Sequence, residues 1–152
     1  MKRIAQIGSL LKKIYRAYSQ ELLKELQERG FTDLRPSFLE ILSFIAENDG
    51  PSIKDIGLAC GLEKQTMTSH LNELEVRGYI KRESSDSDKR ESKIFLTSYG
   101  DKFKLTLIQV ISDLDRIYAK KIGEVELERA QYILENIYKE ISPQTEQLKL
   151  PI

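Results

Sequence analysis

Ser52-Ile-Lys-Asp-Ile-Gly-Leu-Ala-Cys-Gly-Leu62, followed directly by Glu63-Lys-Gln-Thr-Met-Thr-Ser-His-Leu-Asn-Glu-Leu-Glu-Val-Arg-Gly78, is the stretch that decides the fold. Each segment repeats apolar residues at helical spacing, the first set being Ile53, Ile56 and Cys60 and the second Met67, Leu71 and Leu74. Two short amphipathic helices separated by a tight break form a helix-turn-helix pattern.

The ends of these two helices are marked by residues with known capping preferences. Ser52 can cap the first helix, with Asp55 three residues on as a capping-box partner. Gly61 follows the last apolar residue of that helix, where a left-handed cap favours glycine. Gly78 ends the second helix in the same way.

The side of the second helix opposite its apolar residues carries short or flexible polar side chains and no carboxylate. These residues are Lys64, Gln65, Thr66, Thr68, Ser69 and Asn72. Such side chains can donate hydrogen bonds to phosphate oxygens and read base edges in a major groove. The alternative is an ordinary solvated face, since helix-turn-helix units also occur in proteins that never touch DNA.

The residues after Gly78 predict a β-hairpin. Residues 79–83 and 93–96 have β-branched or aromatic character typical of short strands. The polar residues 84–92 between them predict a long charged loop with Lys89 and Arg90 at its tip, where a narrow minor groove would attract an arginine. Any hairpin loop can be polar, but a hairpin directly after a recognition helix is typical of a wing.

Three motifs in this region resemble the MarR family of winged-helix transcription regulators. Leu74-Glu-Val-Arg-Gly-Tyr-Ile-Lys-Arg82 is followed by Asp86-Ser-Asp-Lys-Arg90 and by Phe95-Leu-Thr-Ser-Tyr-Gly100. The family's Asp-x-Arg is matched by Asp88 and Arg90, and its Leu-Thr-x-x-Gly by Leu96, Thr97 and Gly100. Leu34-Arg-Pro-Ser-Phe-Leu-Glu-Ile-Leu42 is similar to the family's second helix, so the resemblance spans about residues 31 to 103.

The resemblance implies a mainly α fold with a small β-hairpin wing, in which residues 1–152 form a single MarR-type unit. Residues 31–100 would be the winged helix-turn-helix, and residues 1–30 and 101–152 the helical dimerisation part. In the wing, Asp88 would hold Arg90, and Arg82 would support the hairpin. The implied function is a homodimeric repressor that binds double-stranded DNA. Ser69 departs from the family, because many members carry arginine there.

The remaining chain predicts four more helices. One runs over residues 4–29, one begins near Pro36, one follows a Thr97 cap to about Ile122, and the last covers residues 124–141. The first, third and fourth carry more apolar surface than a winged helix can cover, and the tail to Ile152 is also apolar. Terminal helices of this kind predict a twofold homodimer, whose two recognition helices would fit a pseudo-palindromic site.

The balanced charge of the chain is an argument against DNA binding. The chain has 24 basic and 24 acidic residues in 152, and residues 53–96 contain eight of each. DNA-binding proteins usually carry a basic surface, so the position of the charges has to decide. We expect Glu73, Glu75, Glu83 and Glu91 to face away from DNA. A winged-helix protein-interaction module, or an antirepressor that no longer binds DNA, is the rival interpretation.

Catalytic chemistry is not indicated. His70 is the sole histidine and lies beside Leu71, where a helix-packing role competes with a DNA contact, and a histidine-rich metal site is excluded. Cys60 is the sole cysteine, so an internal disulfide is excluded, and inert packing is favoured over redox sensing. We predict no enzyme activity, no cofactor and a cytoplasmic location. The sequence has neither a membrane span nor a signal peptide.

A regulatory ligand is suggested by the family resemblance alone. In that architecture a small aromatic effector can bind between the dimer layer and the winged helix. The aromatic residues that could line such a cleft are Tyr15, Tyr18, Phe38 and Phe44. Aromatic residues at helical spacing are more often part of a hydrophobic core.

Overall fold

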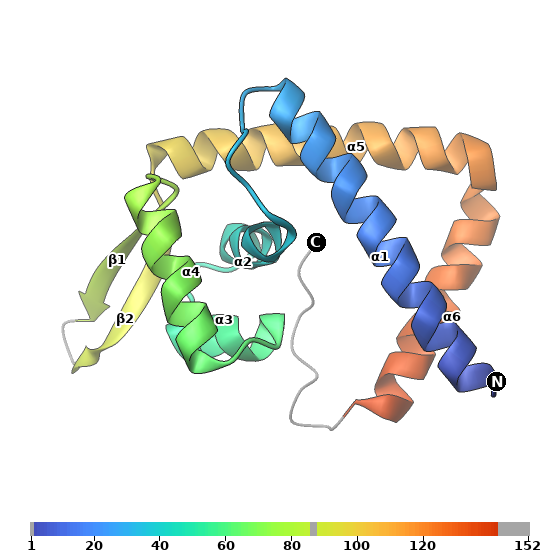
Figure 1. Cartoon of the computed structure of the whole chain (residues 1–152), viewed down its shortest axis with the longest axis horizontal. Coiled ribbons are helices and arrows are strands. Elements are labelled where there is room, and N and C mark those ends of the chain that lie inside the picture. Colours follow the sequence, from blue (N-terminus) through green and yellow to red (C-terminus); the bar gives the residue numbers. More distant parts are fainter. Residues whose placement is uncertain (1, 86–87, 143–152) are drawn as a thin grey trace.

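The computed structural model describes residues 2–85 and 88–142, and the side chains of residues 85 and 88–91 lie outside that description. In the described residues six helices flank one antiparallel hairpin (Figure 1). The elements are α1 (Arg3–Glu28), α2 (Pro36–Glu47), α3 (Ile53–Cys60), α4 (Lys64–Val76), β1 (Ile80–Ser85), β2 (Asp88–Leu96), α5 (Ser98–Ile122) and α6 (Glu124–Ile141). The predicted winged helix, mainly α with a two-stranded hairpin, is confirmed.

The predicted helix ends are also confirmed. The Ser52 hydroxyl accepts a hydrogen bond of 3.1 Å from the Asp55 backbone amide, and the Asp55 carboxylate accepts one of 3.2 Å from the Ser52 amide. Gly61 ends α3 with a φ of 63°, in the left-handed region that favours glycine. Pro36 occupies the first turn of α2, where its missing amide hydrogen costs no helical bond.

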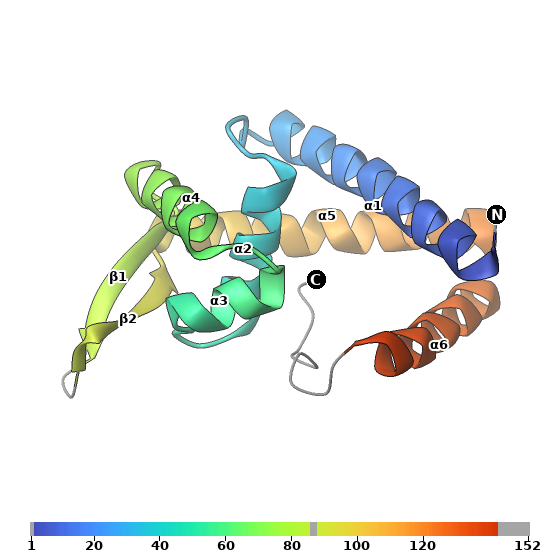
Figure 2. The same cartoon turned by 60° about the horizontal axis from the view of Figure 1, so that its bottom comes forward.

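One hydrophobic core joins the winged helix to the inner parts of α1 and α5. The core is centred on α2, and it includes Leu26 of α1, Phe38 and Ile41 of α2, Leu71 of α4 and Phe103 of α5. Figure 2 shows α5 passing behind the winged helix and continuing toward α6, while the N-terminal half of α1 extends away from the core. The core therefore fixes the winged helix, and it leaves α6 and half of α1 outside.

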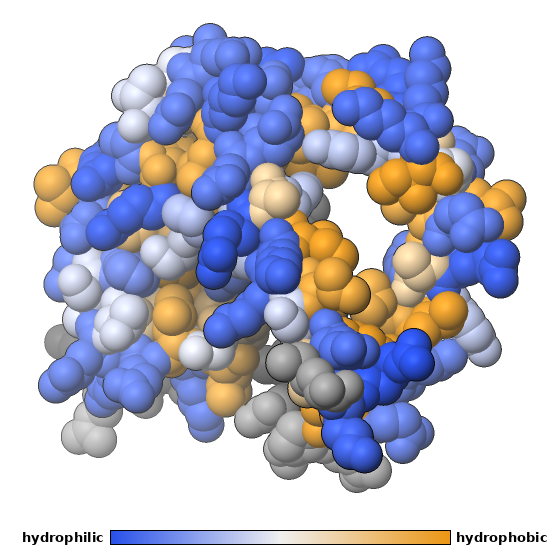
Figure 3. Space-filling view, turned by 45° about the vertical axis from the view of Figure 1, so that its right-hand side comes forward, coloured by the Kyte–Doolittle hydropathy of each residue, from blue (hydrophilic) through white to orange (hydrophobic). Residues whose placement is uncertain are grey.

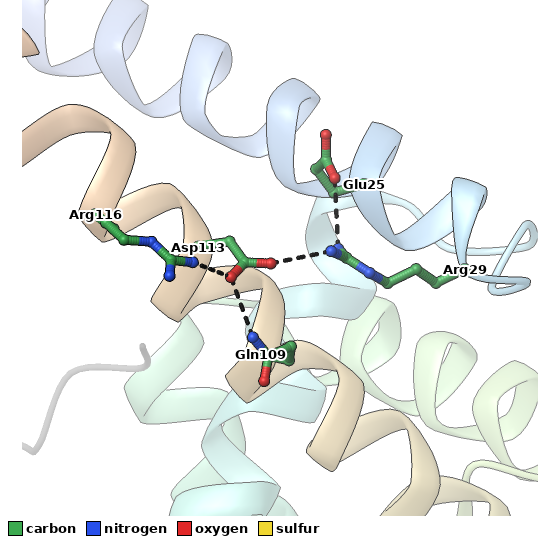
Figure 4. Close-up of polar contacts among 5 residues, drawn as sticks. All are labelled: Glu25, Arg29, Gln109, Asp113 and Arg116. Atoms are coloured by element: carbon green, nitrogen blue, oxygen red, sulfur yellow. Dashed lines mark hydrogen bonds and ion pairs between the residues drawn. The ribbon is translucent and has the colours of Figure 1, made fainter.

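A polar network holds the end of α1 on α5 (Figure 4). The Arg29 guanidinium pairs with Glu25 at 3.4 Å and with Asp113 at 3.1 Å. Asp113 also accepts hydrogen bonds from Gln109 and Arg116 of its own helix. The carboxylate of Asp113 thus serves three donors, one of which comes from a helix distant in sequence.

The hairpin differs from its prediction in length. Its strands pair from Ile80 opposite Leu96 to Ser85 opposite Asp88, with an irregularity between Ser84 and Ser85. The long loop predicted over residues 84–92 was therefore wrong, and Lys89 and Arg90 lie within β2. A polar sequence does not exclude strand structure here, because cross-strand hydrogen bonds satisfy the backbone of a hairpin even where its side chains are polar.

The start of the first strand was also predicted one residue too early. Tyr79 is fully buried, and its hydroxyl donates a 2.7 Å hydrogen bond to Asp33. Its ring lies among Phe31, Tyr99 and Phe103, so it anchors the hairpin to the core before β1 begins.

Two further predictions concern the C-terminal tail and membrane-spanning helices. The apolar tail over residues 143–152 lies outside the described residues. Within residues 2–85 and 88–142, no helix is both long and apolar enough to span a membrane.

Candidate nucleic-acid interface

Helix α4 presents the predicted polar face to solvent. Its buried side carries Met67, Leu71 and Leu74, each at most 1% exposed. The opposite side exposes Lys64, Gln65, Thr66, Thr68, Ser69 and Asn72. Because these six residues take up an exposed flank with no carboxylate among them, the flank can approach a polyanion without burying a repulsive charge. We call these six residues the recognition flank.

The hydroxyl of Thr68 is already engaged inside the helix. It donates a 2.8 Å hydrogen bond to the carbonyl of Lys64, four residues earlier. A phosphate diester oxygen only accepts hydrogen bonds, so Thr68 can donate to phosphate only after breaking this bond. In the conformation described here, Thr68 offers an acceptor and a methyl group to a ligand.

Asn72 is tied to the wing. The guanidinium of Arg82, in β1, donates a hydrogen bond to the side-chain oxygen of Asn72. The same guanidinium lies 3.6 Å from a carboxylate oxygen of Glu75. The sequence singled out Arg82 as wing support but did not predict these partners. The signal was present in the alternation of β1, because Arg82 shares a strand face with the buried Ile80.

Glu73 and Glu83, like Glu75, are acidic side chains near the recognition flank that pair with cations. Glu73 bridges Arg35 at 3.2 Å and Arg77 at 3.3 Å, and Glu83 lies 3.5 Å from Lys81. Such exposed pairs contribute little stability, about 0–1 kcal/mol each. They do reduce the unpaired negative charge beside the recognition flank. The neutral net charge of the chain therefore counts less strongly against DNA binding. Glu91, predicted to face away from DNA with these residues, has a side chain outside the described residues.

The ion pairs of Glu73 belong to a further set of contacts, which the sequence did not predict. The guanidinium carbons of Arg35 and Arg77 lie 4.3 and 5.4 Å from the centre of the Phe38 ring. Arg77 also contacts Asp33 in the segment before α2. The four-residue spacing of Glu73 and Arg77 could have indicated their pairing. Together these contacts fix the C-terminal end of α4 against the start of α2.

His70 and Cys60 have packing environments. The ring of His70 is partly buried and meets the edge of Phe38, with 5.2 Å between the ring centres. Cys60 packs partly buried against the core, and burial, with a smaller effect from Glu40, raises the pKa of its thiol to about 12. A thiol with such a pKa is almost entirely protonated at neutral pH and is a poor nucleophile. Both environments agree with packing, which the sequence favoured for Cys60 and left open for His70.

The wing residues Asp88, Lys89 and Arg90 are placed by backbone alone. All three belong to β2, next to residues 86–87. Their side chains lie outside the described part of the structure, as does the predicted contact between Asp88 and Arg90. The backbone places these residues at the far end of the hairpin from Tyr79 and the core.

The Leu-Thr-x-x-Gly motif has a direct structural reason. The Thr97 hydroxyl accepts a 3.0 Å hydrogen bond from the Gly100 amide, which caps α5, and donates one to the Gly78 carbonyl. A side-chain carbon on Gly100 would lie 2.2 Å from the Tyr79 carbonyl oxygen, so only glycine fits. The motif therefore joins the end of α4, the base of the wing and the start of α5.

The four aromatic residues considered for an effector do not share one environment. Phe38 and Phe44 are at most 5% exposed and belong to the core. Tyr18 is partly buried, and Tyr15 is 43% exposed. The two tyrosines are thus the members of this set that present surface at the junction of α1 and α2.

Comparison with known proteins agrees with this geometry. The sequence pattern of the MarR family matches residues 32–91, from the segment before α2 to the first residues of β2. Over residues 32–91, which form the winged helix, the chain is therefore similar to the MarR family. This confirms the family resemblance drawn from the motifs.

Two curated relatives are regulators by name. The HTH-type transcriptional regulator TtmR of Methylorubrum extorquens is 37% identical over 65 residues, which cover 43% of this chain and 33% of TtmR. A Thauera aromatica protein named for regulation of the hcr operon is 23% identical over 107 residues, covering 70% of this chain and 64% of that protein. The chain thus spans less than two thirds of either relative.

Solved structures extend the likeness in fold beyond residues 32–91. A MarR transcriptional regulator from Methanosarcina mazei Go1 has a TM-score of 0.77 and 19% identity, and the match covers 90% of this chain and 96% of that one. Streptococcus pneumoniae FabT in complex with DNA has a TM-score of 0.73 and 22% identity, over 90% of this chain and 96% of FabT. The flanking helices α1, α5 and α6 are therefore part of the shared fold.

Proposed function

We propose that this chain is a transcription repressor that binds double-stranded DNA as a homodimer on a pseudo-palindromic operator. The recognition flank of α4 enters the major groove, and the hairpin reaches the adjacent minor groove. In this arrangement Lys64 pairs with phosphate, and Gln65, Thr66, Thr68, Ser69 and Asn72 contact base edges or phosphates. Arg90, supported by Asp88, enters the minor groove, with Lys89 near the backbone.

One observation carries this proposal. The six exposed residues of the recognition flank are polar and include no carboxylate, while the nearby acids Glu73 and Glu75 are held in ion pairs by Arg35, Arg77 and Arg82. The MarR-family match over residues 32–91, and the fold shared with FabT, which was solved bound to DNA, support the same function.

The dimer is supported by apolar surface on the flanking helices. In the described structure α6 has no buried residue, and its main packing contact is with α5. Large apolar side chains are exposed on α1 (Ile4, Leu10, Leu11, Ile14), on α5 (Leu105, Ile108, Ile117, Ile122) and on α6 (Val125, Tyr132, Ile133, Ile141). Figure 3 shows such residues around an opening on this side of the molecule. Exposed apolar surface of this extent marks an interface, and a second copy of the chain is the proposed partner.

We further infer a response to a small aromatic effector at the junction of α1 and α2. Tyr15 and Tyr18 offer ring surface there, next to Glu40, at the boundary between the flanking helices and the winged helix. A ligand bound at this boundary can change the spacing of the two recognition helices and so release DNA.

The rival function is a winged helix that binds another protein and not DNA. The neutral net charge favours it, because an affinity for DNA needs a local excess of cations. The pairing of the acids near α4 and the uncharged polar flank favour DNA.

A mobility-shift experiment separates the two. The full chain is titrated onto the duplex upstream of its own gene, at low and moderate salt, with an unrelated duplex of equal length as competitor. Specific retardation that weakens as salt rises supports the proposal. Gln65→Ala should weaken the shift, and Lys139→Ala, an exposed cation of α6, should not. Equal binding to both duplexes, or none to either, would count against it.

A further inference from the structure

Arg82 occupies a position where the fold would normally place an apolar side chain. Side chains alternate across a strand, so Arg82 lies on the same face of β1 as Ile80, which is 2% exposed. Its cross-strand neighbour Ile94 is fully buried. The Arg82 side chain itself is 26% exposed. A cation therefore lies between the base of the wing and α4.

Both partners of this cation belong to α4. Arg82 Nη2 donates to Asn72 Oδ1, and Arg82 Nε lies 3.6 Å from Glu75 Oε1. Asn72 and Glu75 are three residues apart, so they lie next to each other along the helix surface. One guanidinium thus ties the wing to the recognition helix at two adjacent side chains.

The chemistry of this contact fixes the orientation of an amide. A guanidinium has donors and no acceptor, so the atom of Asn72 that meets Arg82 must be the carbonyl oxygen. The amide nitrogen of Asn72 then points to the other side, away from Arg82. Asn72 is exposed and belongs to the same flank as Gln65 and Ser69. Its two N–H donors are therefore directed toward whatever the recognition flank contacts.

We propose that Arg82 is a positioning residue for DNA recognition, which holds Asn72 so that its amide donates to an acceptor on a base edge. This inference rests on the proposed function and deepens it. The acceptors available in the major groove are guanine O6 and N7, adenine N7 and thymine O4. Arg82 acts through Asn72 and touches no base. Its ion pair with Glu75 offsets the negative charge of that carboxylate beside the recognition flank.

A double-mutant cycle tests the proposal. The probe is the duplex that the wild-type protein enriches most from a library with a randomised centre of about 30 base pairs, which holds two half-sites. Arg82→Met should weaken binding to this probe about tenfold in the wild-type background. In the Asn72→Ala background, Arg82→Met should weaken binding by less than about twofold, because the residue that Arg82 positions is gone. Equal losses in both backgrounds would overturn the proposal.

Asn72→Asp separates positioning from simple structural support. The carboxylate keeps the contact with Arg82 and adds charge to it, so the melting temperature should be unchanged or higher. It has no N–H, so the preference for one base pair in each half-site should disappear when the selection is repeated. Repulsion by the new charge would weaken all sequences alike and leave that preference intact. An unchanged preference would therefore contradict the assignment.

The outcomes also distinguish this inference from the proposed function. A wild-type protein that enriches no sequence from the library would overturn DNA recognition, and the role of Arg82 with it. Enrichment by the wild type, with Arg82→Met and Asn72→Ala acting independently, would overturn the role of Arg82 alone. Circular dichroism of each variant confirms that the change is in recognition, since a misfolded Arg82→Met protein would lose binding to every sequence.

Discussion

The hydroxyl of Tyr15, near the middle of α1, donates a hydrogen bond to the carboxylate of Glu40 in α2. This contact joins a helix of the proposed dimer layer to the core helix of the winged part. Burial, followed by the hydrogen bond and the negative charge of Glu40, raises the pKa of Tyr15 to about 12. The fold therefore favours the neutral phenol.

Tyr15→Phe removes this contact and keeps the ring. We expect a loss of about 1 kcal/mol in the free energy of unfolding, since one hydrogen bond is lost and Tyr15 is partly solvated. Urea unfolding at neutral pH measures it. Tyr132→Phe is the matched control, because Tyr132 is 66% exposed on α6 and should not respond.

The same pair gives a dependence on pH. A folded-state pKa of about 12, above the ordinary value of 10, means that the stabilisation by Tyr15 is complete below pH 10. It is lost as pH rises from 10 through about 12, because the unfolded chain releases the proton more readily. The advantage of the wild type over Tyr15→Phe should shrink over this interval. An advantage that stays constant to the end of it would contradict the assigned contact.

Gly100 offers a second prediction. Gly100→Ala places a carbon 2.2 Å from the Tyr79 carbonyl oxygen, so the wing base or the start of α5 must move. We expect the free energy of unfolding to fall by about 1–3 kcal/mol, the usual cost of overpacking. Gly8→Ala, in the exposed part of α1 with no atom within 4 Å, should instead be neutral or stabilising. Two variants that unfold alike would show that the close approach is absent.

The parts of the fold that sequence could predict are those set by local rules. The capping box of Ser52 and Asp55, the glycine at the end of α3 and the helix over 124–141 follow from residues close to one another in sequence. The strand extent of the wing did not follow, because residues 84–92 have no apolar alternation. The described strands β1 and β2 are paired through their backbones. Hydropathy indicates strands only where one face is buried.

In the candidate site, too, the features set by local spacing were predicted and the contacts between elements were not. The exposure of the recognition flank follows from the helical spacing of Met67, Leu71 and Leu74 on the opposite face. The contact of Arg82 with Asn72 joins different elements, and its geometry depends on how the wing docks on α4. A side chain such as Phe38 could be assigned to a core or to a ligand cleft from spacing alone, and the structure places it in the core.

Arg90 provides a prediction for the wing. If Arg90 enters a minor groove, Arg90→Ala should weaken binding to the selected duplex by about 1–3 kcal/mol. It should also reduce the slope of log affinity against log salt concentration by about one, the equivalent of one phosphate contact. Lys24→Ala, which removes an exposed cation of α1, is the control for net charge alone. A salt titration of both variants measures the effect. An identical slope for Arg90→Ala and the wild type would exclude the wing from the interface.

Ile133 tests the proposed dimer. It is 54% exposed on α6, on a helix that buries no residue in the described structure. In a dimer this side chain is covered, and burying an isoleucine contributes about 1.5–3 kcal/mol. Ile133→Glu places a charge in that interface, so sedimentation should show a monomer at concentrations where the wild type is a dimer.

The monomer should also bind the operator more weakly, because a single recognition helix contacts one half-site and does not contact the second. Asp49→Asn changes charge at an exposed position between α2 and α3, outside the flanking helices, and it should retain both the dimer mass and the mobility shift. A wild-type chain that sediments as a monomer would contradict the dimer directly. Retention of full operator affinity by a monomeric Ile133→Glu variant would show instead that one copy is sufficient for recognition.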